Sequence, residues 1–246
     1  MKLFVDLGNS RAKFAWCEKG QLRSAAIIDH ADLSPRSLGN ALRTEQSVSQ
    51  VWISSVASES TTTELQQWLA EQFDGPCHRA CVTKKACGVV NHYLDTAALG
   101  VDRWLAALGA AHLYPDSEVI IVDAGTAVTV DYLSVVGYQG GVILPGNRLM
   151  HESLTGNTAG IEAFAAPADR IIGRNTSECV NSGITYGLAG AVERVVEEMQ
   201  KQTKAEAKLL ITGGAAKSLT GQLLLAMESQ PQLVLLGLAA VAEEHS

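Results

Sequence analysis

The sequence predicts an α/β protein composed of two related lobes. A unit made of an apolar strand, a glycine turn and a second strand occurs twice, as KLFVDLGNSRAKFAW at residues 2–16 and as SEVIIVDAGTAVTVDYL at residues 117–133. Segments typical of strands also alternate with segments typical of helices in both halves, which is the pattern of α/β folds. With 246 residues, of which 47% are hydrophobic, each half can bury a core of its own.

Each copy of the unit has an Asp near the end of the first strand and a hydroxyl residue in the turn. The corresponding sets are Asp6, Gly8 and Ser10 in the first copy and Asp123, Gly125 and Thr126 in the second. Such a turn directs backbone N–H groups and a hydroxyl into one concavity that can bind phosphate oxygens. We therefore expect the two turns to face each other across an interlobe cleft and to bind a nucleoside triphosphate.

In the first lobe, caps and spacing identify the helices. Ser34-Pro35 supplies an N-cap and a proline at the first helical position, and Leu65, Trp68 and Leu69 have helical spacing. We expect strands at 3–6, 12–17, 21–28 and 51–56, an extended segment at 88–93, and helices at 32–46, 63–73 and 102–113. A turn at 114–117 then separates the lobes, which predicts lobes of residues 1–116 and 117–246.

The second lobe begins with the second copy of the unit. Gly140-Gly141 permits close backbone approach, and Pro145-Gly146 indicates a turn. Residues 147–167 are polar and weakly periodic, which predicts a helix and a mobile loop. We expect strands at 119–123, 127–133, 208–212 and near 233, and helices at 182–202, from the Gly213-Gly214 turn to 224, and after 237.

Charge and composition limit the classes of function. The formal net charge is −7, from 19 Lys and Arg against 26 Asp and Glu, and the largest basic cluster is the pair Lys84-Lys85. We therefore expect no nucleic-acid partner. The sequence has no apolar run of about 18 residues and does not begin with a signal-peptide pattern, so we expect a cytoplasmic protein without membrane contact.

The cysteines are interpreted as ordinary reduced thiols. Five cysteines, an odd number, fit a reducing compartment better than a disulfide framework. Cys77, Cys81 and Cys87 lie near His78, but their spacing is not that of paired zinc ligands.

The first candidate site is the segment of residues 6–13. Asp6 can hold Mg²⁺ through water, because this ion keeps part of its hydration shell. The N–H groups after Gly8 can bind phosphate oxygens, and Lys13 adds a positive charge. The alternative is an ordinary hairpin with a surface lysine, but the second copy at Asp123 makes coincidence a weaker explanation. Neither copy has the Walker A or the G-x-G-x-x-G pattern.

The second candidate is the helix start at residues 100–103. In a purely structural interpretation, Asp102 is an acidic residue favoured by the helix dipole and Arg103 is solvated. In a functional interpretation, Asp102 accepts the proton of an attacking hydroxyl and Arg103 binds an anionic part of the acceptor. The residue types alone leave both interpretations open.

Two further segments are weaker candidates. Residues 175–178, Asn-Thr-Ser-Glu, are typical of a helix cap. The Gly213-Gly214 turn after a strand could lie against the flat ring of an adenine, although structural turns look the same.

Taken in order along the chain, the motifs resemble those of the type III pantothenate kinases. They are Asp6-x-Gly8-Asn9-x-x-x-Lys13, Asn91-x-Tyr93, Gly100-x-Asp102-Arg103-Trp104, Asp123-x-Gly125-Thr126, Gly140-Gly141-x-Ile143-x-Pro145-Gly146 and Asn175-Thr176. The resemblance extends from Asp6 to the Gly213-Gly214 turn. It implies the fold of the acetate and sugar kinase, Hsc70 and actin superfamily, with two actin-like (ribonuclease H-like) lobes. It also implies phosphorylation of pantothenate by ATP to 4'-phosphopantothenate, the first step of coenzyme A biosynthesis.

The resemblance further implies roles for individual residues. ATP would bind to Asp6, Leu7, Gly8, Asn9, Ser10, Arg11, Ala12, Lys13 and Thr126. Pantothenate would bind to Tyr93, Gly100, Val101, Asp102, Arg103 and Thr176. Asp102 would be the catalytic proton acceptor, and Asp123 would bind an activating monovalent cation, K⁺ or NH₄⁺. ATP would be used with Mg²⁺, and the protein would be a homodimer.

This sequence departs from the family pattern at two places. Ser10 stands where many members have Thr, which keeps the hydroxyl, and Asn147-Arg148 follows Pro145-Gly146 at a variable position. Two alternative functions stay open: a kinase of the same superfamily that acts on another small hydroxylated acceptor, such as a sugar, and a non-catalytic nucleotide-binding regulator.

Overall fold

The fold is described from a computed structural model. The residues that it describes are 1–158, 161, 170–204 and 206–245. By their contacts they form two compact units, the first with Met1–Pro115, Val136–Tyr138 and Gln232–Ser246 and the second with Asp116–Val135 and Gln139–Pro231. The boundary that the sequence predicts after residue 116 lies one residue from the division between Pro115 and Asp116. The C-terminal segment, by contrast, groups by its contacts with the first unit.

The first unit contains a five-stranded sheet in the order β3-β2-β1-β4-β5. Its strands are β1 (Lys2–Leu7), β2 (Arg11–Glu18), β3 (Gln21–Asp29), β4 (Gln50–Ser55) and β5 (Cys77–Arg79). The first three strands form an antiparallel meander, and β4 and β5 continue the sheet in parallel with β1.

The second unit repeats this topology in the order β10-β9-β8-β11-β12. Its strands are β8 (Val119–Ala124), β9 (Ala127–Ser134), β10 (Gly137–Pro145), β11 (Lys208–Thr212) and β12 (Glu228–Ser229). Again the first pair is antiparallel, and β11 and β12 run parallel to β8. The prediction of two related α/β lobes is confirmed, because both sheets are built in the same strand order.

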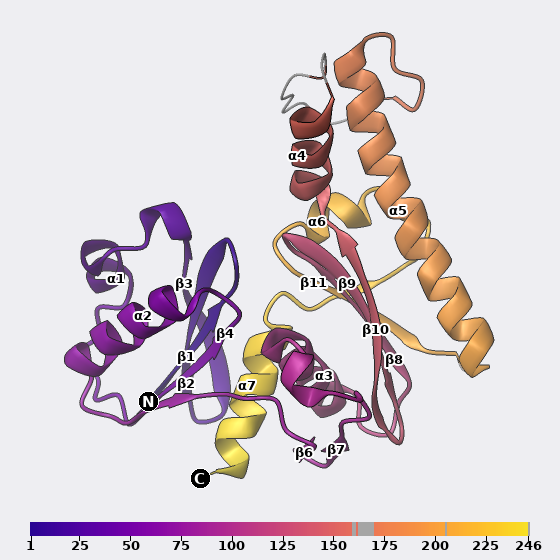
Figure 1. Cartoon of the computed structure of the whole chain (residues 1–246). Helices are drawn as coiled ribbons and strands as arrows, with labels where there is room; N and C mark the ends of the chain where they lie inside the picture. The colour runs from indigo at the N-terminus through magenta and orange to yellow at the C-terminus, as the bar shows by residue number, and fades with distance from the viewer. Residues whose placement is uncertain (159–160, 162–169, 205, 246) are drawn as a thin grey trace. The chain divides into compact units, whose positions relative to one another are not determined.

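Helices cover the sheet of the first unit (Figure 1). They are α1 (Pro35–Ala41), α2 (Glu59–Gln72), α3 (Val101–Leu113) and α7 (Leu233–Glu244), with a short hairpin of β6 (Lys85–Ala86) and β7 (Val89–Val90) and 3₁₀ turns at His30–Asp32 and Thr96–Ala98. Leu3 and Val5 of β1 pack with residues of α1 and α2 in one core. Alternation along β1 therefore places Asp6 on the opposite face of the sheet.

The second unit has three helices among its described residues. They are α4 (Asn147–Asn157), α5 (Thr176–Thr203) and α6 (Ala216–Thr220). Val192 and Val196 of α5 pack with Ile120 and Val122 of β8 in the core of this unit. Asp123 alternates with these two β8 residues and therefore lies on the other face of the sheet.

Helices α3 and α7 meet through two glycines. A Cβ on Gly237 of α7 would overlap the backbone oxygen of Leu105, and a Cβ on Gly109 of α3 would overlap the backbone oxygen of Leu233. These helices therefore pack backbone against backbone, side by side in Figure 1. This contact fixes α3, the helix that begins with the second candidate site.

Replacing Gly237 with alanine should separate the two helices. We expect the free energy of unfolding to fall by about 2 kcal/mol, as for other overpacked sites. Gly190 lies in α5, and a Cβ added there would meet no atom within 4 Å, so Gly190→Ala is the matched control. That control should be neutral or stabilising by up to about 1 kcal/mol. Urea unfolding of both variants measures the difference, and equal stabilities would contradict the close contact.

Several sequence-based boundaries were wrong. The helix expected at 32–46 is confined to Pro35–Ala41, in a segment where Gly39 and Asn40 are poor helix formers. Strand β5 was not predicted, because the three residues Cys77–Arg79 show no alternation of apolar and polar side chains. The strand forms through its parallel pairing with β4. The helix expected at 182–202 begins at Thr176, because Asn175 caps it with a hydrogen bond from the Glu178 N–H.

The C-terminal segment also differs from its prediction. Leu233 does not lie in a strand but begins α7, which continues through Gly237 without interruption. A short apolar run fits a strand or a buried helix equally well, and contact with α3 decides for the helix. In the segment 147–167, the expected helix is confirmed as α4, whereas most of the expected loop lies outside the described residues.

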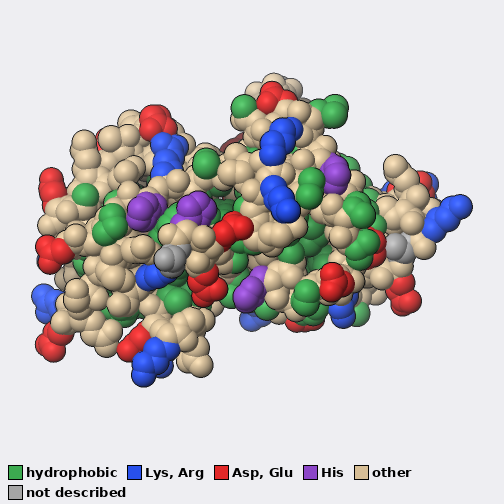
Figure 2. Space-filling model, turned by 90° about the horizontal axis from the view of Figure 1, so that it is seen from below, with side chains coloured by type: hydrophobic (Ala, Val, Ile, Leu, Met, Phe, Trp, Pro, Cys, Tyr) green, Lys and Arg blue, Asp and Glu red, His purple; other side chains and the backbone are tan. Residues whose placement is uncertain are grey.

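The surface carries charges of both signs. Figure 2 shows one face on which acidic and basic side chains are interspersed among apolar ones. In the part of the chain that the structure describes, no helix has both the length and the apolar character needed to cross a bilayer.

Candidate functional site

The first glycine turn connects β1 to β2. The N–H of Gly8 donates to the backbone oxygen of Arg11 at 3.0 Å, which closes the turn. Asp6 lies one residue before the end of β1, is 8% exposed, and has Lys13 as its partner on β2. The buried carboxylate and the half-buried lysine thus lie on neighbouring strands below the turn. Both interpretations of residues 6–13 predict this hairpin, and its role in binding phosphate stays a prediction.

The second turn has the same construction and is one residue shorter. The Gly125 N–H donates to the backbone oxygen of Ala127 at 2.9 Å. Asp123 again lies one residue before the end of its strand, and its partner on β9 is Thr129 rather than a lysine. The second lobe therefore places a carboxylate and hydroxyls at the position where the first lobe has a carboxylate and a cation.

Two glycines pack against this second turn. Gly146 follows β10, and its N–H donates to the backbone oxygen of Thr126 at 3.1 Å. Gly213 follows β11 with φ of +95°, and a Cβ there would overlap Oδ1 of Asp123. Only glycine fits between Asp123 and this backbone. Gly146 therefore packs on the backbone of the second turn, and Gly213 packs on the Asp123 carboxylate itself.

Asp102 lies in the first turn of α3. Gly100 is the N-cap and offers no side chain, and the Asp102 carboxylate accepts a hydrogen bond from the Arg103 N–H at 2.8 Å. A Cβ on Gly100 would lie 2.5 Å from Oδ1 of Asp102. The helix N-terminus stabilises a negative charge here, and Gly100 leaves room for the carboxylate.

Arg103 is held in an aromatic cluster and is not solvated. Its side chain is buried, with the residue 7% exposed, and its guanidinium carbon lies 5.8 Å from the ring centroid of Tyr93. Tyr138 stacks on Tyr93 at 6.4 Å and meets Trp104 edge-on at 6.1 Å. A buried arginine is costly unless it serves a structural or binding purpose. The purely structural interpretation of Arg103 as a solvated side chain is therefore wrong.

The loop that carries Tyr93 is fixed by Asn91. Asn91 is buried, its amide donates to the backbone oxygen of Thr83 at 3.1 Å, and its side-chain oxygen accepts from the Tyr93 N–H at 3.0 Å. The backbone of the next residue, His92, donates to the oxygen of Tyr138 at 2.9 Å. These hydrogen bonds fix the backbone at Tyr93 and connect it to the backbone at Tyr138.

A hollow of about 660 Å³ opens at the start of α3. Its lining comes from the ends of β4 and β5 and from the segment before α3, and it includes Ser55, Arg79, Gly100 and Val101. Ser55 pairs with Leu7, so this hollow lies at the same sheet edge as the first glycine turn. Ligands of open α/β sheets bind at the carboxyl ends of parallel strands. The first unit alone therefore brings the first glycine turn, the hollow and the start of α3 to one edge of the sheet.

Thr176 belongs to the second unit. It is the first residue of α5 and is exposed, next to the capping residue Asn175. Glu178 accepts hydrogen bonds from the Arg174 N–H and from the Asn175 amide, which completes the cap. The expected cap is confirmed, and the role of Thr176 in binding stays a prediction.

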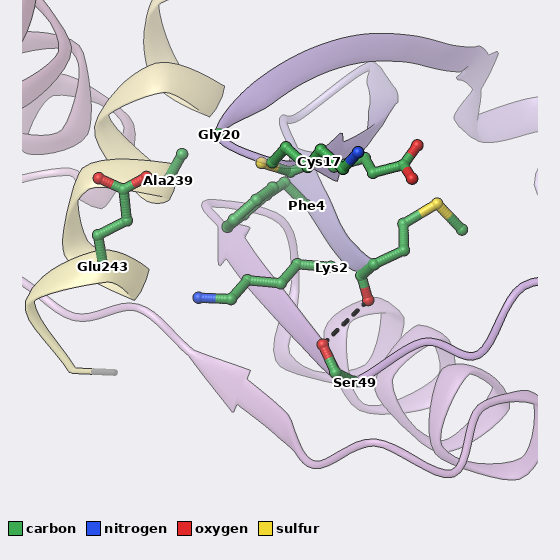
Figure 3. A pocket seen from close by; sticks show the side chains of 10 residues that line it. Lys2, Phe4, Cys17, Gly20, Ser49, Ala239 and Glu243 are labelled. Carbon is green, nitrogen blue, oxygen red and sulfur yellow. Dashed lines mark hydrogen bonds between the residues drawn. The ribbon is translucent and has the colours of Figure 1, made fainter.

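A second hollow, of about 360 Å³, lies between the start of β1 and α7 (Figure 3). Lys2 extends toward α7, where its Nζ donates to the backbone oxygen of Ala242 at 3.4 Å. Burial raises the pKa of the Cys17 thiol, so this side chain stays protonated and weakly nucleophilic at neutral pH. None of the predicted site residues lines this hollow.

The cysteine cluster has no metal-site geometry. Within the described ranges, no three His, Cys, Asp or Glu side chains are grouped so that they could hold a metal ion. Burial, followed by the charge of Glu244, raises the pKa of Cys87 to about 11. Cys87 is therefore a structural thiol that contacts the end of α7.

Sequence reasoning missed Tyr138 and the strand residues Ser54 and Thr212. Tyr138 follows a glycine at the start of β10, and nothing local links it to Tyr93. Ser54 and Thr212 are hydroxyl residues that directly follow the apolar central residues of their strands, and this change of residue type was a signal that could have been used.

The family model and the curated relatives indicate the same family. The family model described as type III pantothenate kinase matches residues 2–198. A type III pantothenate kinase of Alkalilimnicola ehrlichii is 36% identical over 244 residues, which cover 98% of both chains. One of Chromobacterium violaceum is 35% identical over 246 residues, covering 98% of this chain and 99% of the relative.

A solved structure shares the fold at low sequence identity. The inorganic polyphosphate/ATP-glucomannokinase of Arthrobacter sp. strain KM has a TM-score of 0.51 and 14% identity, with 99% of each chain covered. This likeness concerns the fold alone and agrees with the predicted actin-like, sugar-kinase-like class of α/β lobes.

Proposed function

The chain belongs to the type III pantothenate kinase family, and we propose that it transfers the γ-phosphoryl group of ATP to the hydroxyl of pantothenate, forming 4'-phosphopantothenate for coenzyme A biosynthesis. The observation that carries the proposal is the sheet edge of the first unit. There the first glycine turn, which follows β1, a hollow of about 660 Å³ and the acidic start of α3 lie together. A donor phosphate and an acceptor alcohol both have a place at such an edge.

Asp102 is proposed as the group that orients the alcohol. A carboxylate is too weak a base to ionise an alcohol in advance, so it aligns the hydroxyl and receives its proton late in the transfer. A hydrogen bond from the Arg103 N–H to Oδ1 at 2.8 Å holds the Asp102 carboxylate at the start of the helix. Val101 and Gly100 form the wall of the hollow beside it.

Arg103 and Tyr93 are proposed to bind the rest of pantothenate. Pantothenate carries a carboxylate, and a guanidinium fork matches a carboxylate in geometry and charge. Because Arg103 is buried against Tyr93, its direction is set before the substrate arrives. Thr176 of the second unit is proposed as a further contact, as in the family pattern.

ATP is proposed to bind through the two glycine turns. Residues 6–13 offer backbone N–H groups and Lys13 to its phosphates, and Thr126 offers a hydroxyl. The kinase family uses a divalent metal, and the buried Asp6 carboxylate at a strand end fits a hydrated Mg²⁺. When bound, Mg²⁺ neutralises charge that develops on the phosphate oxygens.

Asp123 is proposed as the ligand of a monovalent cation, K⁺ or NH₄⁺. Its carboxylate lies beside Thr129 and Thr212 on neighbouring strands, and oxygen ligands of this kind suit such ions. The backbone of Gly213 packs directly against Asp123, which fixes the carboxylate.

A homodimer in the cytoplasm completes the proposal. In the first unit, apolar side chains next to Tyr93 are exposed: Leu94 by 99%, Val136 by 65% and Val90 by 38%. A ring nitrogen of His92 lies 3.1 Å from the backbone oxygen of Val136 in a hydrogen bond. The segment around Tyr93 therefore contacts the turn between β9 and β10. Grouped exposed apolar side chains favour a protein contact. Light scattering, which should give twice the chain mass, tests the dimer.

The decisive experiment is ADP formation with pantothenate, with and without K⁺. We expect ADP release that depends on pantothenate and that K⁺ stimulates over Na⁺ at equal ionic strength. Asp123→Asn should lose the K⁺ stimulation and keep the basal rate. ADP release with sugars but not pantothenate would favour another small-molecule kinase. ATP binding without ADP release would favour a nucleotide-binding regulator.

A further inference from the structure

Both lobes place a hydroxyl beside the strand-end carboxylate. In the first unit, Asp6 pairs in register with Ser54 on β4. In the second, Asp123 pairs with Thr212 on β11. Residues paired across neighbouring strands point to the same face of a sheet, so each hydroxyl shares a face with its carboxylate. The two lobes differ in residue type here but keep the same functional group.

Both hydroxyls are buried and have no hydrogen-bond partner among the described residues. Ser54 is 0% exposed and Thr212 is 1% exposed. For Ser54 Oγ and Thr212 Oγ1 alike, the described part of the chain supplies no hydrogen-bond partner. A buried hydroxyl that bonds to nothing destabilises a fold, and native structures keep such groups rarely. The recurrence at equivalent positions of two lobes therefore calls for a common cause, and a polar ligand would satisfy both hydroxyls.

The usual spacing of neighbouring strands fits a water molecule as the ligand. Neighbouring strands lie about 4.8 Å apart, and a water molecule that bonds at about 2.8 Å on each side spans that gap. An apolar ligand would leave the hydroxyl unsatisfied. A carboxylate beside such a water is a ligand set for a hydrated cation.

We propose that Ser54 and Thr212 are positioning residues, each holding a water molecule that is shared with the neighbouring carboxylate and belongs to the hydration shell of the cation bound there. Ser54 holds a water molecule of the divalent cation at Asp6, and Thr212 holds a water molecule of the monovalent cation at Asp123. The inference rests on the proposed function, because it takes these cations from it. Ser54 and Thr212 are thereby added to the proposed cation sites, and water binding explains why both residues carry a hydroxyl.

The test compares three buried hydroxyls that are replaced by apolar groups of similar shape. Ser54→Ala and Thr212→Val remove hydroxyls without a protein partner among the described residues. Thr62→Val is the matched control, because Thr62 is 0% exposed and its hydroxyl bonds to Ser55 Oγ at 2.7 Å and to the Ser58 oxygen at 2.9 Å. Thr212→Ser keeps the hydroxyl and should restore wild-type behaviour.

We expect the ligand-free melting temperature to be unchanged or raised in Ser54→Ala and Thr212→Val, and lowered in Thr62→Val. The Mg²⁺ concentration that gives half of the ATP-induced thermal shift should rise about 10-fold in Ser54→Ala. The K⁺ concentration for half-maximal stimulation should rise about 10-fold in Thr212→Val. Thr62→Val should change neither concentration.

Two results would overturn the inference. One is wild-type Mg²⁺ and K⁺ dependence in Ser54→Ala and Thr212→Val. The other is a loss of ligand-free stability as large as in Thr62→Val, which would mean that the hydroxyls have structural partners. The ATP-induced shift needs no acceptor, so it separates this inference from the proposed function, which fails instead if the wild-type protein releases no ADP with pantothenate.

Discussion

Asp102→Asn should lower kcat by about 10²-fold or more while the affinity for ATP changes little. Asparagine has nearly the same shape and can still accept the hydrogen bond from the Arg103 N–H, so the start of α3 should remain folded. It cannot accept the proton of the alcohol, and general-base contributions are typically worth about 10²- to 10⁴-fold. Steady-state ADP formation and an ATP titration measure the two quantities separately.

The control for this variant is Asp74→Asn, which removes an exposed carboxylate of the first unit away from the hollow. It should keep wild-type kcat. A full wild-type kcat in Asp102→Asn would remove Asp102 from the mechanism. A fall in melting temperature together with weaker ATP binding would instead indicate a structural role at the helix start.

The repeated turns and the α3 start were predictable because their signals are local. In each turn an apolar strand, an Asp, a glycine and a hydroxyl lie within a few residues, and in both copies the glycine N–H closes the turn by donating to a backbone oxygen at the start of the next strand. Likewise, an acidic residue after Gly100 and before an apolar helix indicates a helix start whatever its partners are.

Contacts between distant segments were not predictable in this way. Tyr138 completes the aromatic cluster around Arg103, but its sequence neighbours indicate only a strand. The helical state of Leu233 depends on the close approach of Gly237 to α3, which no local pattern reports. The burial of Arg103 is of the same kind, since a charged residue early in a helix is usually exposed.

Arg103→Gln should raise KM for pantothenate by about 10²-fold, with a smaller change in kcat and little change in KM for ATP. Removing one partner of a buried charge pair costs about 2–5 kcal/mol, and each 1.4 kcal/mol is a factor of ten in affinity. Arg103→Lys keeps the charge but lacks the planar fork, so it should lie between the wild type and Arg103→Gln. Arg36→Gln, at an exposed position of α1, is the control for the change in net charge.

A neutral amide of pantothenate shows whether Arg103 binds the carboxylate itself. In the wild-type protein, the amide should have a higher KM than pantothenate, because the buried guanidinium loses its anionic partner. In Arg103→Gln, the two compounds should have similar KM values, since the interaction that separates them is gone. This double-mutant cycle isolates one pair of groups. If Arg103→Gln instead weakened both compounds by the same factor, Arg103 would act by holding Tyr93 in place and not by binding the substrate carboxylate.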